Sequence, residues 1–167
     1  MTFLSLNTLN AETKSFTEIE PRVRGLIVVN PLEIKTSISE LEKYRNDPAF
    51  VGIKTIQDFY NKELDDPAYR QIFSHFEDTP GWTIMAHLPG MDRLATQLPH
   101  FQFVAAHSTW RHRDFASLKN VWFDIATSTA DRRDANLDDL LAVVGEDRIL
   151  FSSDAQLMNP AWTLGKL

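Results

Sequence analysis

The sequence predicts an α/β fold built on parallel strands. Short, continuously apolar runs alternate with amphipathic stretches along the whole chain, which is the order of strand and helix in such folds. The runs lack the alternation of apolar and polar residues that marks a strand with one solvated face, so they are typical of parallel strands buried on both sides. No linker, repeat or low-complexity stretch divides the chain, so we expect residues 1–167 to form a single domain, with residues 1–24 as a lead-in of helix and loop.

Six runs are predicted to be strands, and each is too short for a typical helix. Their number fits both a closed barrel and an open doubly wound sheet. The six runs are Gly25–Asn30, Phe50–Lys54, Trp82–His87, Phe101–His107, Val121–Ala126 and Arg148–Ser153.

The stretches between these runs are predicted to be helices. Thr36 or Ser37 is expected to cap a helix that continues through Tyr44. Asn136 is expected to cap a later helix with a leucine-rich face, and Gly145 to end it. Apolar residues at helical spacing predict further helices over residues 68–76, 91–98 and, less regularly, 11–20.

The composition is that of a globular protein and excludes several classes of function. Hydrophobic residues make up 43% of the 167 positions, and the formal net charge of −6 does not favour nucleic acid or an anionic membrane. No apolar run approaches the ~20 residues of a membrane span, and no signal peptide is recognisable, so we expect a cytoplasmic protein. Cysteine is absent, so any metal must be held by His, Asp, Glu or a modified Lys.

Polar residues stand where four of the predicted strands end. Lys54, His87 and His107 close their runs, and Asp154 follows the last one. A single histidine in such a place is commonly just packed and hydrogen-bonded. Neighbouring parallel strands lie ~4.8 Å apart, however, so several strand ends can converge on one ion. Two imidazoles and a carboxylate suit Zn²⁺, Mn²⁺ or Fe²⁺.

Several segments also match a known family in sequence and in order. The chain resembles the amidohydrolase-related family, also called amidohydrolase family 2, of metal-dependent (β/α)₈-barrel hydrolases, from about Gly25 to Asp154. The matching segments are Gly25–Pro31, Phe50–Lys54, Ile84–His87, Leu98–His107, Asn120–Asp124 and Gly145–Asp154, the last reading Gly-Glu-Asp-Arg-Ile-Leu-Phe-Ser-Ser-Asp.

The resemblance implies a TIM-type barrel in which the runs of this chain are strands three to eight. It makes His87 the fifth-strand metal ligand, His107 the sixth-strand histidine that binds metal or polarises substrate, and Asp154 the eighth-strand ligand and proton shuttle. It further implies one divalent ion, with zinc expected first and manganese or iron as alternatives. The implied activity is hydrolysis, or the related non-oxidative decarboxylation, of a small organic acid, amide or lactone.

The beginning of the chain departs from the family pattern. Family members open with a His-x-His-type strand that supplies two further ligands, whereas the first 24 residues contain no His. A full barrel takes ~250 residues, so we expect the first two strands to be missing here. Three explanations stay open: a fragment of a longer reading frame, a short form completed by a homodimer, or an inactive remnant that acts, if at all, by association. His107-Ser-Thr-Trp110 also replaces a segment that is usually glycine-rich.

Two further positions are candidates for binding a substrate. Lys54 could be carbamylated or, as we expect, could keep a solvated or paired ammonium. Arg111 and Arg113 flank His112 at the rim of the predicted pocket, where an arginine could bind a substrate carboxylate, although a solvated loop is the simpler reading. An open doubly wound domain with a small acidic ligand would need a glycine-rich strand-to-helix turn, which the sequence lacks.

Overall fold

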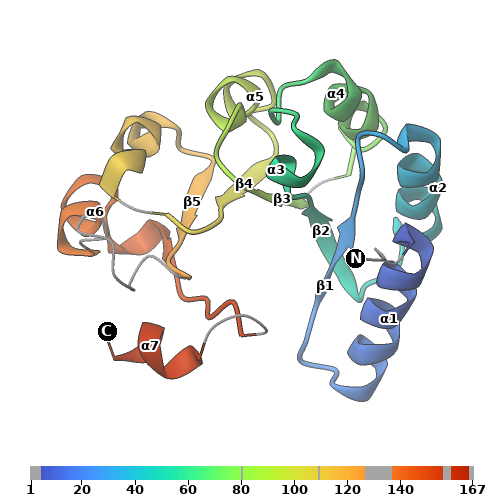
Figure 1. Ribbon diagram of the computed structural model, residues 1–167, viewed down its shortest axis with the longest axis horizontal. Helices are drawn as coiled ribbons and strands as arrows, with labels where there is room; N and C mark the ends of the chain where they lie inside the picture. Colours follow the sequence, from blue (N-terminus) through green and yellow to red (C-terminus); the bar gives the residue numbers. More distant parts are fainter. Residues whose placement is uncertain (1–4, 80, 109, 127–136, 156–158, 166–167) are drawn as a thin grey trace.

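The computed structural model describes residues 5–79, 81–108, 110–126, 137–155 and 159–165, apart from the side chains of residues 110, 111, 162 and 163. Strands and helices alternate within these ranges (Figure 1). The strands are β1 (Gly25–Val28), β2 (Phe50–Lys54), β3 (Thr83–Ala86), β4 (Gln102–Ala105), β5 (Val121–Asp124) and β6 (Ile149–Leu150). The α-helices are α1 (Leu6–Ile19), α2 (Ile34–Tyr44), α3 (Gln57–Tyr60), α4 (Pro67–Ser74), α5 (Met91–Gln97), α6 (Leu137–Val144) and α7 (Pro160–Leu164), and the 3₁₀ helices are η1 (Trp110–Ser117) and η2 (Glu146–Arg148).

The strands of the described residues form one parallel sheet whose order follows the chain, from β1 to β6 without reversal. A doubly wound sheet reverses its strand order at a switch point, so this order belongs to a barrel. Figure 1 shows the sheet as an arc with α2, α4, α5 and α6 around its outside. The predicted α/β fold with parallel strands is confirmed, in the form of an incomplete barrel.

The two faces of the sheet differ in burial. A row of side chains in register across five strands faces the helices and is completely buried. The next row, which includes Lys54 and Met85, faces the other way and is mostly half-buried. The prediction of two buried faces therefore holds only for the face that the helices cover. The buried row consists of Ile27, Ile53, Ile84, Phe103 and Val121.

Local signals predicted most of the element boundaries to within a few residues, with two clear errors. The helix predicted over residues 11–20 is α1, which begins five residues earlier, at Leu6. We expected Thr36 or Ser37 to cap α2, but the helix begins at Ile34 and Ser37 lies inside it. The Ser37 hydroxyl instead bonds the backbone of Asn30, accepting from its N and donating to its O at 2.9 Å each. Gly145 ends α6 as predicted, with a positive φ of 79°, while Asn136 lies outside the described residues.

Four of the described elements were not predicted: α3, η1, η2 and α7. The single turn α3 follows β2, and η1 replaces the solvated loop expected after His107. At the beginning of the chain, α1 starts at Leu6, where the Ser5 hydroxyl accepts from Thr8 N and caps the helix. No helix in the described ranges combines the length and the apolar character needed to cross a bilayer.

Candidate active site at the carboxyl edge of the sheet

The residues predicted from strand ends lie along one edge of the sheet. Lys54 ends β2, His87 follows β3 directly, and His107 comes two residues after β4. The rings of the two histidines meet edge to face, with centroids 5.2 Å apart and planes inclined by 81°. The sheet therefore brings together the two imidazoles that we predicted as metal ligands.

Each imidazole is held through the same ring nitrogen. His87 Nδ1 lies 2.6 Å from Asp58 Oδ2, and His107 Nδ1 lies 3.3 Å from Ala126 O. Carboxylate and carbonyl oxygens can only accept, so in both rings Nδ1 carries a hydrogen, and in the neutral form of each ring Nε2 then has the lone pair. This is the tautomer in which a histidine binds a metal through Nε2.

The backbone is unusual at two of the predicted site residues. His107 has a φ of 56° and Asp154 a φ of 51°, in the left-handed region that residues with a Cβ seldom adopt. Among the described non-glycine residues, only Asn61 at the end of α3 shares this conformation. Such backbone strain is commonly found at functional sites. Here it changes the direction of the backbone at both residues, at the carboxyl edge of the sheet.

Lys54 links the strand ends electrostatically. Burial lowers the pKa of its ammonium, and the negative charges of Asp124 and Asp154 oppose that lowering. Asp124 is itself buried at the end of β5, where Oδ1 accepts from Ala126 N at 2.7 Å. Lys54 is thus a half-buried cation within electrostatic range of two carboxylates, one of which is the predicted ligand Asp154.

The donor set fits a divalent ion, although it is not preassembled. Two imidazoles with Nε2 lone pairs and one carboxylate are ligands that zinc, manganese and iron accept. Over the described part of the chain, no three His, Asp or Glu side chains are close enough together to form a ready metal cluster. His87 and His107 form a pair, and Asp154 stands on the same edge.

Sequence reasoning missed two residues of the site, Gln57 and Asp58. Both lie in α3, and both contact His87. Their signal was the pair of polar residues three and four positions after Lys54, at the edge where the other candidates lie. It was too local to show that this turn folds over the neighbouring strand.

The arginine segment after His107 differs from expectation. The side chain of Arg111 lies outside the described residues, and Arg113 is exposed. His112, which the loop reading placed at the surface, is instead half-buried in η1, and burial lowers its pKa to about 4. Its ring lies edge-on to Phe115, with centroids 6.4 Å apart, so His112 is part of the packing of η1.

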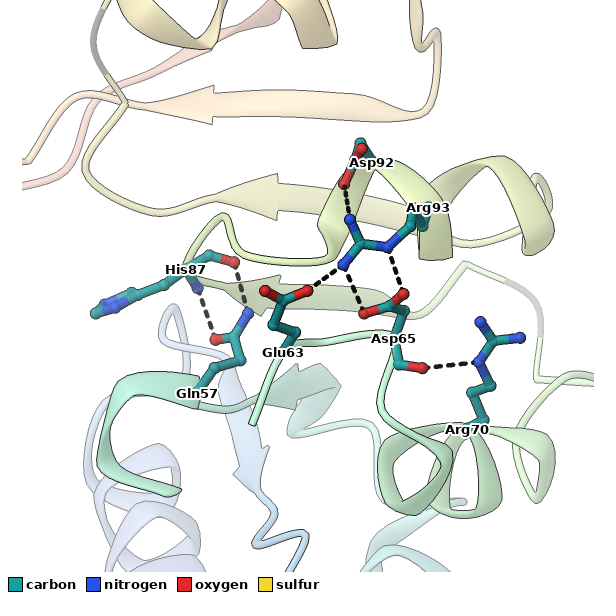
Figure 2. Close-up of polar contacts among 7 residues, drawn as sticks. All are labelled: Gln57, Glu63, Asp65, Arg70, His87, Asp92 and Arg93. Carbon is teal, nitrogen blue, oxygen red and sulfur yellow. Dashed lines mark hydrogen bonds and ion pairs between the residues drawn. The ribbon is translucent and has the colours of Figure 1, made fainter. Parts of the chain in front are cut away.

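An ion-pair cluster holds the loop after α3 against α5. The Arg93 guanidinium donates to the carboxylates of Asp65 and Glu63 (Figure 2). The hydrogen bond from Arg93 lowers the pKa of Asp65. Leu64 N also donates to Pro89 O at 2.8 Å. These contacts fix the segment that leads away from α3 across the end of β3.

Comparison with known proteins places this arrangement in context. The family model described as Amidohydrolase matches residues 7–167. Among solved structures, the chain is similar to 2,6-dihydroxybenzoate decarboxylase from Rhizobium, with 18% identity and a TM-score of 0.69 over 95% of this chain and 68% of that one. None of the curated proteins matches the sequence.

Two further structures have the same fold. A 5-carboxyvanillate decarboxylase from Novosphingobium aromaticivorans, complexed with manganese and 4-hydroxy-3-methoxy-5-nitrobenzoic acid, is 14% identical, with a TM-score of 0.69 over 96% of this chain and 61% of that one. The 5-carboxyvanillate decarboxylase of Sphingomonas paucimobilis is 15% identical, with a TM-score of 0.68 over 93% of this chain and 63% of that one. The chain therefore spans about two-thirds of the length of these proteins.

Proposed function

The chain belongs to the amidohydrolase family, and from that premise we propose that its carboxyl edge is a metal-dependent site for hydrolysis or non-oxidative decarboxylation of a small organic acid. The observation that carries the proposal is the pair of imidazoles 5.2 Å apart at the ends of adjacent parallel strands, His87 after β3 and His107 after β4. Aromatic carboxylates are the first substrates to test, because decarboxylases of dihydroxybenzoate and carboxyvanillate have the same fold.

In this proposal His87, His107 and Asp154 hold one divalent ion, which leaves a position open for substrate or water as catalytic sites require. Zinc is the first expectation, with manganese or iron as alternatives. When bound, the ion supplies a Lewis acid that polarises an oxygen of the substrate. The left-handed backbone of His107 and Asp154 supports the assignment, because both side chains depend on it for their direction.

The side chains of the chain itself account for binding and proton movement. The Lys54 ammonium attracts the substrate carboxylate, and Arg111 is a second candidate for that contact. In hydrolysis, the Asp154 carboxylate takes a proton from the attacking water. In decarboxylation, the bond between the substrate carbon and its carboxylate group breaks, and the electron pair of that bond stays on the substrate carbon. The carboxylate group leaves as carbon dioxide, and Asp154 in its protonated form delivers its proton to the substrate carbon.

Metal content per chain tests the proposal. The protein, grown with added zinc or manganese, is analysed by elemental mass spectrometry beside a His87→Ala/Asp154→Ala double variant. His100→Ala/Asp114→Ala is the matched control, because it removes the same two residue types from exposed positions. We expect near-stoichiometric metal in the wild type and in the control, and its loss in the site variant.

Circular dichroism must show that all three proteins are folded, so that lost metal is not lost structure. Metal-loaded protein is then screened for carbon dioxide release from hydroxylated benzoates and for hydrolysis of amides and lactones. Folded wild-type protein without metal under these conditions would overturn the proposal. It would leave the chain as a barrel remnant without catalysis of this kind.

A further inference from the structure

The turn α3 contacts the main chain of His87 through one buried amide. Gln57 is 1% exposed, and its side chain forms two hydrogen bonds with His87, as Figure 2 shows. Gln57 Nε2 donates to His87 O at 2.6 Å, and His87 N donates to Gln57 Oε1 at 3.0 Å. The amide thus pairs with His87 as a residue of a neighbouring strand would, one position beyond the end of β3.

The next residue of the same turn contacts the ring. Asp58 Oδ2 accepts from His87 Nδ1 at 2.6 Å, while the side chain of Asp58 is 62% exposed and that of His87 24% exposed. A carboxylate that accepts at Nδ1 leaves the lone pair on Nε2. One helical turn therefore fixes both the backbone and the ring of a single histidine through two consecutive residues.

We propose that Asp58 is a positioning residue that sets the tautomer and the ring orientation of His87, with Nε2 as the metal-binding atom, and that Gln57 fixes the backbone from which the ring projects. The metal-binding part of this inference rests on the proposed function. Carboxylates that accept from the second nitrogen of a metal-bound histidine orient the ring and raise its basicity, and their loss typically weakens metal binding by about 10–100-fold.

The second histidine gives the test an internal reference. His107 has its Nδ1 hydrogen directed to the backbone oxygen of Ala126, which no substitution at position 58 removes. A change at Asp58 should therefore alter the His87 ring and leave the His107 ring as it was. If Asp58 formed only a surface ion pair with no positioning role, its replacement would alter the tautomer of neither histidine.

The first measurement is made on metal-free protein. Long-range ¹H–¹⁵N NMR spectra of the histidine rings at about pH 8, where an ordinary imidazole is neutral, report which nitrogen carries the hydrogen. We expect the Nδ1–H form of His87 in the wild type and in Asp92→Ala, a control that removes an exposed carboxylate from α5. We expect Asp58→Ala to shift His87 toward the Nε2–H form, and Asp58→Glu to restore Nδ1–H at least in part.

The second measurement is the affinity for Zn²⁺ or Mn²⁺, by competition with a chelator. We expect Asp58→Ala to bind about 10-fold more weakly or worse, and Asp58→Glu to recover part of the loss. An unchanged tautomer together with unchanged affinity in Asp58→Ala would overturn the role of Asp58 and leave the metal site standing. A wild type that binds neither metal would instead overturn the proposed function, whatever the tautomer of His87.

Discussion

Asn10 in α1 pairs with the outer edge of β1 through Val28. Its Oδ1 accepts from Val28 N at 2.8 Å, and its Nδ2 donates to Val28 O at 3.3 Å. Val29 N donates to Lys54 O on the β2 side, so by alternation the groups of Val28 point away from the sheet. The side chain of a helix therefore satisfies a strand edge that would otherwise attract another strand.

Replacement of Asn10 by Ala should destabilise the protein by about 1–2 kcal/mol, because a partly buried donor and acceptor of Val28 lose their partners. The amide also donates to Glu40 Oε2 at 3.2 Å, and that contact is lost as well. Chemical denaturation with urea measures the difference. Asn7→Ala on the exposed side of α1 is the control, expected to change the free energy of unfolding by less than about 0.5 kcal/mol; equal effects would contradict the role of Asn10.

The left-handed backbone at Asp154 predicts that Asp154→Gly is more stable than Asp154→Ala by about 1 kcal/mol. Both variants lack the carboxylate, so their difference isolates the backbone. Thermal unfolding of the two variants measures it. At Asp147, inside η2, the order should reverse, because glycine there only adds freedom to the unfolded chain. The same order at both positions would argue against strain at Asp154.

The lowered pKa of Lys54 predicts a rise of stability with pH. In the unfolded chain the ammonium has its ordinary pKa of 10.5, whereas burial lowers the folded value. Between the two pKa values the unfolded state binds more protons, so the free energy of unfolding increases as pH rises. Relative to Lys54→Met, the wild type should therefore gain stability as the pH is raised from about 7 toward 10.5, which urea titrations at several pH values measure.

A second neutral variant, Lys54→Gln, separates the charge of Lys54 from the shape of its replacement. The stability of the wild type should rise with pH relative to both Lys54→Met and Lys54→Gln, even if the two variants differ in stability at neutral pH. If the free energy of unfolding of the wild type, relative to either variant, stays constant or falls as the pH rises, burial of the ammonium is contradicted.

The ion pair between Asp65 and Arg93 should be lost in acid. Its hydrogen bond lowers the pKa of Asp65 below the ordinary 3.8, so the stabilisation is present above about pH 4 and disappears as the pH falls through the lowered value. Asp65→Asn should cost about 1 kcal/mol at pH 7, a modest value because Arg93 is half-exposed. It should also make stability less dependent on pH between about 4 and 2.

Unfolding curves of wild type and Asp65→Asn at pH 7, 4 and 3 test this prediction. Asp147→Asn, an exposed carboxylate in η2, is the control and should differ from the wild type by less than about 0.5 kcal/mol at pH 7. If the difference in the free energy of unfolding between wild type and Asp65→Asn does not become smaller in acid, the contact with Arg93 does not contribute as described.

The sequence predicted the interior strand β2 better than the edge strand β6. The predicted bounds of β2 match the structure, whereas the run Arg148–Ser153 yields only the two paired residues of β6. In the described residues β6 pairs with β5 alone, so the remainder of the run lacks a partner that would make it a strand. An apolar pattern reports the tendency to be buried, but pairing depends on what lies alongside.

The candidate site divides in the same way. The shared edge of His87 and His107 could be predicted from position alone, because parallel strands end at one edge and both residues lie within two positions of a strand end. Gln57 and Asp58 could not, because their role depends on how the four-residue turn α3 folds onto His87, at the end of the next strand, β3. The prediction that Ser37 caps α2 failed for a related reason. Its hydroxyl has a partner in the preceding loop, at Asn30, that a capping rule does not consider.

The two hydrogen bonds between Gln57 and His87 tie the order of the proposed metal ligand to the local folding of α3. The amide hydrogen of His87 should exchange slowly with solvent although β3 ends one residue earlier, because Gln57 Oε1 covers it. When the turn Gln57–Tyr60 opens, it should release the backbone and the ring of His87 in one cooperative event. If this edge binds an ion as proposed, the fraction of molecules ready to bind it is set by the opening equilibrium of these four residues. Temperature should then shift that fraction well below the temperature at which the sheet unfolds.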